Sequence, residues 1–227
     1  MTRPPPSELN LAWRVGVAIL GFVWWLLFRT RSVGSERVPR SGPAVIAANH
    51  VSALDGVVLA LVTARRSGRI TRFLTAAEFF AKPRFGWALR LYRQIPIARG
   101  AGDAAALAEA IETIRDGALA GIFPEGRVNA GDPAELQRGH TGVARIALAT
   151  DARVVPAGIW GTHVRWPRSG LTWHRPLRPR IAIAYGEPLA PDGDADSRED
   201  LEGFTEDIMR AIEAQVAVAR RAAEDPA

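Results

Sequence analysis

A histidine and a carboxylate lie five positions apart in the run Asn49-His50-Val51-Ser52-Ala53-Leu54-Asp55. A histidine can take a proton from a hydroxyl group at neutral pH. If the chain turns back after Ser52, Asp55 can accept the N–H of the other ring nitrogen, fix the tautomer and stabilise the imidazolium. We therefore interpret His50 as a general base and Asp55 as the group that orients it.

Other catalytic groups are scarce in this chain. It has no cysteine, and no Gly-x-Ser-x-Gly motif presents a serine nucleophile. The simplest chemistry is therefore direct, with His50 activating a hydroxyl group of the substrate. The competing interpretation is a surface histidine next to an acidic residue that stabilises a helix N-terminus. Asn49 is expected to support the site by hydrogen bonding. A metal site is not predicted, because no spacing gathers His140, His163 and His174 with carboxylates.

A second motif, Phe123-Pro124-Glu125-Gly126-Arg127, follows an apolar run that starts at Ala118. Glu125 either positions a substrate or is an ordinary turn carboxylate. Gly126 lets the backbone come close to a ligand and can point its N–H at an anion. Arg127 adds a positive charge at the same place. These features predict a second part of one site.

The two motifs resemble those of the glycerolipid acyltransferases, the family of lysophosphatidic acid acyltransferases and their relatives. The first family block is His-x-x-x-x-Asp, commonly after Asn, and the third is Phe-Pro-Glu-Gly followed by Ser or Thr. Arg127 stands where the hydroxyl residue is usual. The remaining blocks are matched by 95–100, which contains Arg99, and by 154–157, while Arg138 precedes glycine where the family often has a lysine. The resemblance covers about 42–186.

The resemblance implies transfer of a fatty acyl group from acyl-CoA or an acyl carrier protein to a lysophospholipid hydroxyl. The expected acceptor is 1-acylglycerol-3-phosphate, which would become phosphatidic acid. Because the thioester drives the transfer, no cofactor is expected. The implied substrate-binding residues are Asn49, Arg99, Glu125, Gly126, Arg127 and Arg138. Two alternatives stay open: another lipid acceptor, such as an ornithine lipid or a glycolipid, and a non-catalytic membrane lipid-binding protein.

Composition limits the partners. The formal net charge is +5, and all basic residues except Lys82 are arginine. The excess favours anionic partners such as lipid phosphates, coenzyme phosphates or an acidic carrier protein. Nucleic acid is not expected, because there is no recognised nucleic-acid motif and no long basic run. The absence of cysteine fits a reducing compartment.

The segment Val15 to Phe28 is continuously apolar and contains Trp24 and Trp25. It is short for a membrane span, which needs about 20 apolar residues. Arginines follow it on one side only, and tryptophans next to arginines suit a membrane interface with a cytoplasmic flank. We therefore expect residues 1–30 to form a membrane-associated segment, half-inserted or spanning, that holds an acyltransferase domain (31–227) at the cytoplasmic face of the cell membrane. The alternative is an apolar helix buried against the domain.

The remaining pattern predicts an α/β fold with a mixed, largely parallel sheet flanked by helices. A polar hinge is expected over Ser32–Ser41. Strands are predicted at 44–48, 70–75, 95–98, 118–123, 153–159 and 181–185, and helices at 54–66, 103–116, 142–149 and 197–223. His50 would then lie at the carboxyl end of a strand, where open α/β sheets bind ligands. The stretch 161–179, with Trp166 and Trp173, is either an ordinary loop or a second membrane-facing or donor-binding surface.

Overall fold

The computed structural model describes residues 11–97, 104–173 and 175–225. Within these residues one seven-stranded sheet forms the centre of the molecule. From edge to edge its strands are β1 (Arg29–Val33), β7 (Arg180–Tyr185), β6 (Arg153–Trp160), β2 (Ala44–Ala48), β5 (Leu119–Ile122), β3 (Thr71–Ala76) and β4 (Ile95–Ile97).

The sheet is mixed but mostly parallel. The β6–β7 pair is antiparallel, and the other neighbouring pairs run parallel. The central strand β2 reads Ala-Val-Ile-Ala-Ala, and all five residues are buried. Such a run is typical of a parallel strand covered on both faces. The predicted fold class is therefore confirmed for the sheet and its flanking helices.

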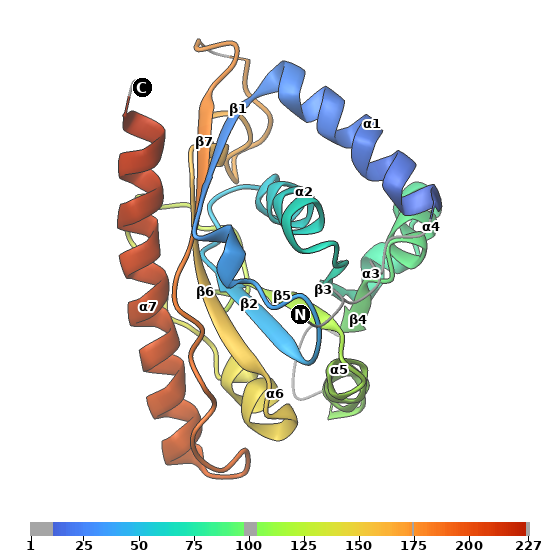
Figure 1. Cartoon of the computed structure of the whole chain (residues 1–227), viewed down its shortest axis with the longest axis vertical. Coiled ribbons are helices and arrows are strands. Elements are labelled where there is room, and N and C mark those ends of the chain that lie inside the picture. Colours follow the sequence, from blue (N-terminus) through green and yellow to red (C-terminus); the bar gives the residue numbers. More distant parts are fainter. Residues whose placement is uncertain (1–10, 98–103, 174, 226–227) are drawn as a thin grey trace, which may run out of the picture.

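Helices cover both faces of the sheet (Figure 1). On one face, α1 (Leu11–Leu27) and α2 (Asp55–Ser67) pack against Ala44, Ile46 and Ala48 of β2. On the other face, Val45 and Ala47 belong to the core with α5 (Ala104–Arg115), α6 (Gly142–Thr150) and α7 (Arg198–Glu224). The short helices α3 (Ala77–Phe80) and α4 (Pro83–Leu91) connect β3 to β4. The alternation of side chains along β2 thus separates the two cores.

The connections out of β2 and β5 run in opposite directions across the sheet. The chain leaves β2 through α2 to reach β3, and it leaves β5 through α6 to reach β6 on the far side of β2. The loops after β2, β5 and β6 therefore meet at the carboxyl edge of three adjacent parallel strands. Such a switch in direction is where open α/β sheets form a ligand crevice.

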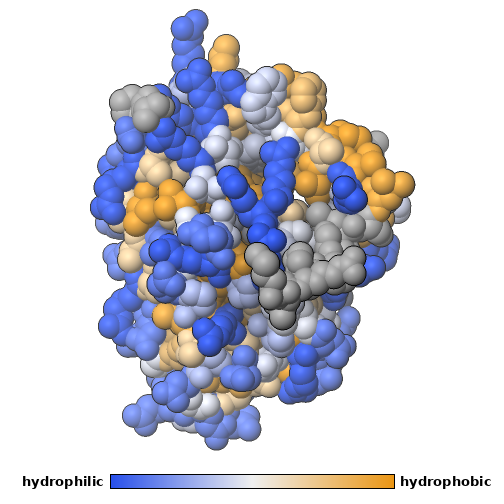
Figure 2. Space-filling model, in the orientation of Figure 1, coloured by the Kyte–Doolittle hydropathy of each residue, from blue (hydrophilic) through white to orange (hydrophobic). Residues whose placement is uncertain are grey.

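Helix α1 is shorter than a membrane span, and no helix among the described residues is long and apolar enough to cross a bilayer. One side of it is packed: Trp13 lies edge-on to the Tyr92 ring, and Trp24 donates a hydrogen bond to Thr30 at 2.8 Å. Its other side leaves large apolar residues exposed, among them Ile19, Phe22 and Trp25. Figure 2 shows apolar residues gathered over this helix.

The expected hinge at Ser32–Ser41 is wrong at its start. Residues Arg29–Val33 form the edge strand β1, which pairs in parallel with β7, and a short 3-10 helix follows at Ser35–Arg37. Polar residues predominate in β1 because it lies at the edge of the sheet, so its strand conformation depends on pairing with residues about 150 positions later. The expected domain boundary at residue 30 falls within this strand.

Candidate active site

His50 and Asp55 lie side by side in the loop between β2 and α2. His50 Nδ1 is 3.0 Å from Asp55 Oδ2, and Asp55 is the first residue of α2. An ionised carboxylate only accepts hydrogen bonds, so Nδ1 carries the proton in this pair. That tautomer leaves Nε2 with a lone pair that can accept a proton from a substrate.

The carboxylate of Asp55 is completely buried and held on several sides. Its Oδ2 also accepts the backbone N–H groups of Val51 and Ser52, each at 2.7 Å. Its Oδ1 accepts the hydroxyl of Thr162 at 2.6 Å. A buried charge needs such partners, and bonds to a charged acceptor are the strong ones. The network fixes the carboxylate and therefore the direction in which His50 points.

The His50 ring is also fixed from its face. It stacks on Phe123, with ring centres 4.1 Å apart and planes 12° apart, and Phe123 in turn stacks on Phe73. The side chain of His50 remains 19% exposed. The imidazole is thus held in one plane while part of it still faces solvent or a substrate.

Glu125 is buried and contacts the loop between β2 and α2, residues 49–54, which is called here the catalytic loop. Its Oε1 accepts the backbone N–H of His50 at 2.7 Å, and its Oε2 accepts that of Gln137 at 3.0 Å. Burial raises the pKa of this carboxyl, although the two backbone donors act in the opposite direction. Glu125 therefore joins the loop after β2 to the loop after β5. Its expected contact with an acceptor stays a prediction.

Asn49 holds the end of β2 against β6. Its amide nitrogen donates to the carbonyl of Ile159 at 3.0 Å, and its amide oxygen accepts the N–H of the same residue at 2.7 Å. Asn49 is buried, so both ends of its amide are used inside the protein. This geometry agrees with the expected supporting role.

The expectation that the N–H of Gly126 points at an anion is wrong. This N–H donates to the carbonyl of Phe123 at 3.0 Å and closes the turn after β5. The glycine is needed for another reason: its φ is +68°, and a Cβ atom there would lie 3.1 Å from a ring carbon of His140. Gly126 shapes the turn that carries Glu125.

The three arginines predicted to bind substrate lie in different places. Arg127 is exposed next to the turn and donates to the side chain of Gln137 at 2.9 Å. Arg138 is exposed and lines a groove of about 520 Å³ with Arg145 and residues of α7, away from the cavity beside His50 described next. Arg99 lies outside the described residues.

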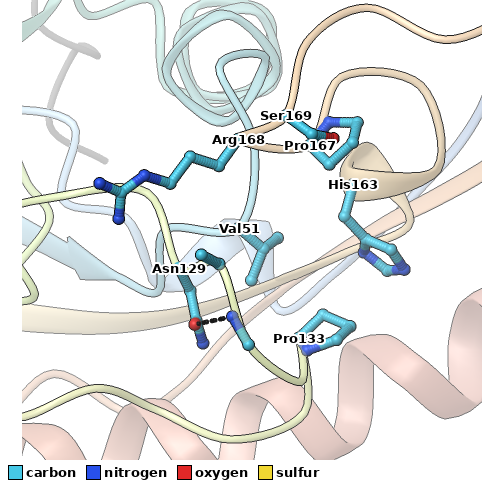
Figure 3. Close-up of a pocket in the computed structure, with 9 residues that line it drawn as sticks. Val51, Asn129, Pro133, His163, Pro167, Arg168 and Ser169 are labelled. Atoms are coloured by element: carbon cyan, nitrogen blue, oxygen red, sulfur yellow. Dashed lines mark hydrogen bonds between the residues drawn. The ribbon is translucent and has the colours of Figure 1, made fainter.

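A cavity of about 370 Å³ is lined in part by Val51, the residue that follows His50. Figure 3 shows side chains from three loops around it: Val51 after β2, Asn129 and Pro133 after β5, and His163 and Arg168 after β6. The same three loops carry the catalytic pair and its supports. The cavity is therefore placed to hold part of a substrate whose reacting group lies at His50.

His163 is the second histidine of this region. Burial lowers its pKa, while the charges of Asp55 and Asp132 act to raise it. Its Nδ1 is buried and has no hydrogen-bond partner in the described part of the chain. No group of three or more potential metal ligands occurs among the described residues.

Sequence reasoning assigned no role to Thr162 or Phe123. Thr162 lies two residues beyond β6, and β6 is the parallel neighbour of β2, so its place in the strand order brings it to Asp55. Phe123 was recognised as part of a motif but not as a ring that stacks on His50. A search of the residues that follow each parallel strand would have included both.

Comparison with known proteins agrees with the resemblance of the sequence motifs to those of the glycerolipid acyltransferases. Residues 29–160, more than half of the chain, match the family described as Acyltransferase. An uncharacterised protein of Mycobacterium tuberculosis is 33% identical over 75% of this chain and 55% of its own length. The N-acylphosphatidylethanolamine synthase of Arabidopsis thaliana is 29% identical over 68% of this chain and 58% of its own.

Two further similarities concern proteins named for one acceptor. The 1-acyl-sn-glycerol-3-phosphate acyltransferase of Borreliella burgdorferi is 27% identical over 62% of this chain and 55% of its own. The crystal structure of the 1-acyl-sn-glycerophosphate acyltransferase PlsC from Thermotoga maritima covers 90% of this chain and 78% of its own, with a TM-score of 0.70 and 23% identity, which establishes a shared fold. The chain spans about half the length of the curated relatives that it matches. On the family match and the His50–Asp55 geometry, the chain belongs to the glycerolipid acyltransferase family.

Proposed function

We propose that this protein transfers a fatty acyl group from a thioester to a hydroxyl group of a membrane lipid. The observation that carries the proposal is the His50–Asp55 pair, 3.0 Å apart at the carboxyl edge of a parallel sheet. Asp55 is itself fixed by Val51, Ser52 and Thr162. A histidine held in this way is suited to general-base catalysis.

In the proposed reaction, Nε2 of His50 takes the proton of the acceptor hydroxyl as its oxygen attacks the thioester carbonyl carbon. Asp55 stabilises the imidazolium through its bond to Nδ1. The tetrahedral intermediate then collapses, the carbon–sulfur bond breaks, and the departing thiolate takes the proton from His50. The products are an ester and a free thiol. No metal or redox cofactor takes part in this scheme.

The proposed acceptor is 1-acylglycerol-3-phosphate, with acyl-CoA or an acyl carrier protein as donor. Supporting this choice are the four sequence blocks and the name of the Borreliella relative. Arg99 and Arg127 are the proposed phosphate contacts, because a guanidinium group suits two phosphate oxygens. Replacing Arg99 by alanine is expected to raise the acceptor KM by about tenfold or more, the effect of losing a bond worth roughly 1.5–3 kcal/mol.

Two observations favour a second acceptor class. The Arabidopsis relative has a name that places an acyl group on the nitrogen of phosphatidylethanolamine. Arg127 also departs from the hydroxyl residue usual at that position. An amine-bearing or sugar-bearing lipid is therefore the alternative acceptor.

We propose that the enzyme works at the cytoplasmic face of the cell membrane, with α1 lying in the interface. The support is the set of exposed apolar residues on α1, including Phe22 stacked on Trp25. An interfacial helix buries such a face among lipid headgroups and acyl chains. The tails of the acceptor would then stay in the leaflet while its hydroxyl reaches His50.

The test uses purified full-length protein, an acyl thioester and a panel of acceptors, with products identified by mass spectrometry. Transfer to 1-acylglycerol-3-phosphate at the highest kcat/KM is the expected result. If an amine-bearing or sugar-bearing lipid is acylated at a higher kcat/KM, that lipid and not 1-acylglycerol-3-phosphate would be the acceptor. If no acceptor is acylated and the thioester stays intact, the protein would instead be a lipid-binding protein without acyltransferase activity.

A further inference from the structure

Residues 165–173 and 175–178, called here the aromatic loop, follow β6 and carry large apolar side chains that are exposed. The exposed fractions are 62% for Trp173, 66% for Leu177 and 48% for Leu171, and Trp166 is 40% exposed. A soluble monomer rarely exposes apolar residues gathered in this way without a binding function. The proposed chemistry does not require these four side chains.

The aromatic loop has a defined shape. Arg165 is buried at its start, and its guanidinium donates to the backbone carbonyls of Thr172 at 2.7 Å, Pro176 at 2.9 Å and Leu177 at 3.0 Å. The same group lies 5.0 Å from the centre of the Trp173 ring. A buried arginine thus holds the backbone from inside while the apolar side chains point outward.

The charged side chains in the sequence around these apolar residues are all positive. From Gly161 to Gly186 there is no aspartate or glutamate, while there are five arginines. Arg168 and Arg175 are exposed within the aromatic loop itself. Arginines beside tryptophans and leucines match an anionic membrane surface, where headgroup phosphates lie above the apolar chains.

The aromatic loop continues the exposed apolar surface of α1. The guanidinium of Arg178 lies 5.0 Å from the centre of the Trp25 ring and donates to the Trp25 carbonyl. The backbone N–H of Arg29 donates to the carbonyl of Pro179 at 3.0 Å. Figure 1 shows the loop beside the C-terminal end of α1. The two segments therefore present apolar residues side by side.

The aromatic loop is also tied to the catalytic loop. The carbonyl of Trp166 accepts the Ser52 hydroxyl at 2.7 Å and the N–H of Ala53 at 3.3 Å. Pro167, Arg168 and Ser169 form one wall of the cavity beside His50 (Figure 3). A lipid that reaches this loop from the bilayer is therefore already at the entrance to the site.

We infer that the aromatic loop is a second membrane-contacting surface, in addition to α1, which binds the anionic bilayer interface and opens the catalytic cavity towards it. Its apolar side chains enter the interface, and Arg168 and Arg175 face lipid phosphates. The inference relies on the proposed function only in that the acceptor is a membrane lipid.

The first test uses the absence of native cysteine. Leu177→Cys and a matched control, Val33→Cys, are labelled with a polarity-sensitive fluorophore. Val33 is 40% exposed and lies at the opposite end of β1 from Arg29, whose N–H contacts Pro179 beside the loop. On addition of vesicles of phosphatidylcholine and phosphatidylglycerol, the dye at 177 should brighten and shift to shorter wavelength, and the dye at 33 should not. An unchanged spectrum at 177, while the protein cosediments with the vesicles, would overturn the inference.

The second test measures vesicle affinity without a label. The double variant Leu171→Ser/Leu177→Ser should bind these vesicles about tenfold more weakly than the wild type, and Val33→Ser should bind as the wild type does. Arg175→Gln should lose about fivefold in affinity for anionic vesicles and little for vesicles of phosphatidylcholine alone. The serine variant should keep its turnover on a short-chain, water-soluble acceptor, which shows that the fold and the chemistry are intact.

The remaining outcomes separate the alternatives. Unchanged vesicle affinity with a lower turnover only when acyl carrier protein is the donor would overturn the inference and make the loop a carrier-protein surface. Equal losses on soluble and vesicle-bound acceptors would also overturn it, because the loop would then support the active site alone. If the wild type transfers acyl groups to no acceptor, the proposed function fails, while the fluorescence and binding results still decide whether the loop meets the bilayer.

Discussion

Two turns at the same edge of the sheet each carry a buried carboxylate, and they use it differently. In the turn after β2, Asp55 contacts the imidazole of His50 directly and also binds two backbone N–H groups and the Thr162 hydroxyl. In the turn after β5, Glu125 accepts the backbone N–H groups of His50 and Gln137, and its pKa is raised because burial outweighs the interactions that lower it. One carboxylate contacts the ring of the proposed general base, and the other holds the backbone of the same residue.

The difference teaches that residue type and burial do not by themselves assign a role at this site. Both acids follow a buried parallel strand; from the sequence, Asp55 was expected to orient His50 and Glu125 to position a substrate or to be an ordinary turn carboxylate. The atoms around them decide: Asp55 contacts the ring of His50, which gains a proton in the proposed reaction, while Glu125 contacts amide groups, which do not. Substitutions at the two turns should therefore differ in size and in pH dependence.

The largest effect is expected for His50→Ala, which removes the group that takes the proton. The kcat should fall by about 10³-fold or more, within the range that general-base catalysis contributes. The measurement is steady-state acyl transfer, with circular dichroism to show that the variant is folded. Near-normal turnover in folded protein would contradict the proposed mechanism.

Asp55→Asn should reduce kcat by about 10²–10³-fold, because the amide can no longer stabilise the imidazolium and can turn its NH₂ group towards Nδ1. The double variant with His50→Ala should be no slower than His50→Ala alone, since the two residues act as a unit. If the fold-loss in kcat of the double variant equals the product of the two single losses, Asp55 has a role that does not depend on His50.

Glu125→Gln should lower kcat by about tenfold, less than Asp55→Asn, because it loosens the position of His50 without touching the ring. The amide can satisfy only one of the two backbone donors. The pH optimum should keep its shape, since the titrating imidazole is unchanged. A change in acceptor KM alone would show instead that Glu125 contacts the substrate.

The same variant tests the raised pKa of Glu125 through stability. A carboxyl whose pKa is higher in the folded than in the unfolded state makes the folded state bind more protons. The wild type should therefore gain stability relative to Glu125→Gln as the pH falls from about 7 towards the ordinary value of 4.5. The free energy of unfolding of both proteins, measured by urea titration at several pH values, checks the sign. A relative loss towards acid pH would mean that the pKa is lowered.

The smallest effect is expected for Thr162→Val, which keeps the shape of the side chain and removes one hydrogen bond to Asp55. The kcat should fall by a few-fold to about tenfold, and unfolding should cost about 1–3 kcal/mol less, as for an unsatisfied buried acceptor. Thr150→Val is the matched control, because the Thr150 hydroxyl is buried and bonds only within α6. It should lose stability and keep kcat. If the two variants have the same kcat, the hydrogen bond from Thr162 to Asp55 does not contribute to catalysis.

Much of the fold was predictable because its strands and helices carry strong periodic patterns. Where the structure describes them, the predicted segments agree with the observed ones to within about one residue, for example 54–66 with α2 at Asp55–Ser67 and 197–223 with α7 at Arg198–Glu224. The edge strand β1 was missed, since Arg-Thr-Arg-Ser-Val has no apolar run and becomes a strand by pairing with β7. Helices α3 and α4 were not among the predicted helices.

For the membrane segment, sequence and structure contribute different parts. The apolar run at 15–28 predicted a helix with an affinity for membranes, and α1 is present at Leu11–Leu27. The structure adds that Trp13 and Trp24 face the domain while Phe22 and Trp25 face outward. The packed side agrees with the alternative of an apolar helix packed on the domain, and the association of the exposed side with a membrane stays a prediction.

By itself the sequence determined the central strands and the His50–Asp55 pair, because these depend on local order: five residues are few enough for a short turn to bring the carboxylate to the ring. Only the tertiary structure decided that Glu125 holds the backbone of His50 and that Thr162 donates a hydrogen bond to Asp55. It also decided that the aromatic loop lies against both α1 and the catalytic loop. These contacts join residues 75 to more than 100 positions apart. They follow from the order of parallel strands in the sheet, which no local spacing specifies.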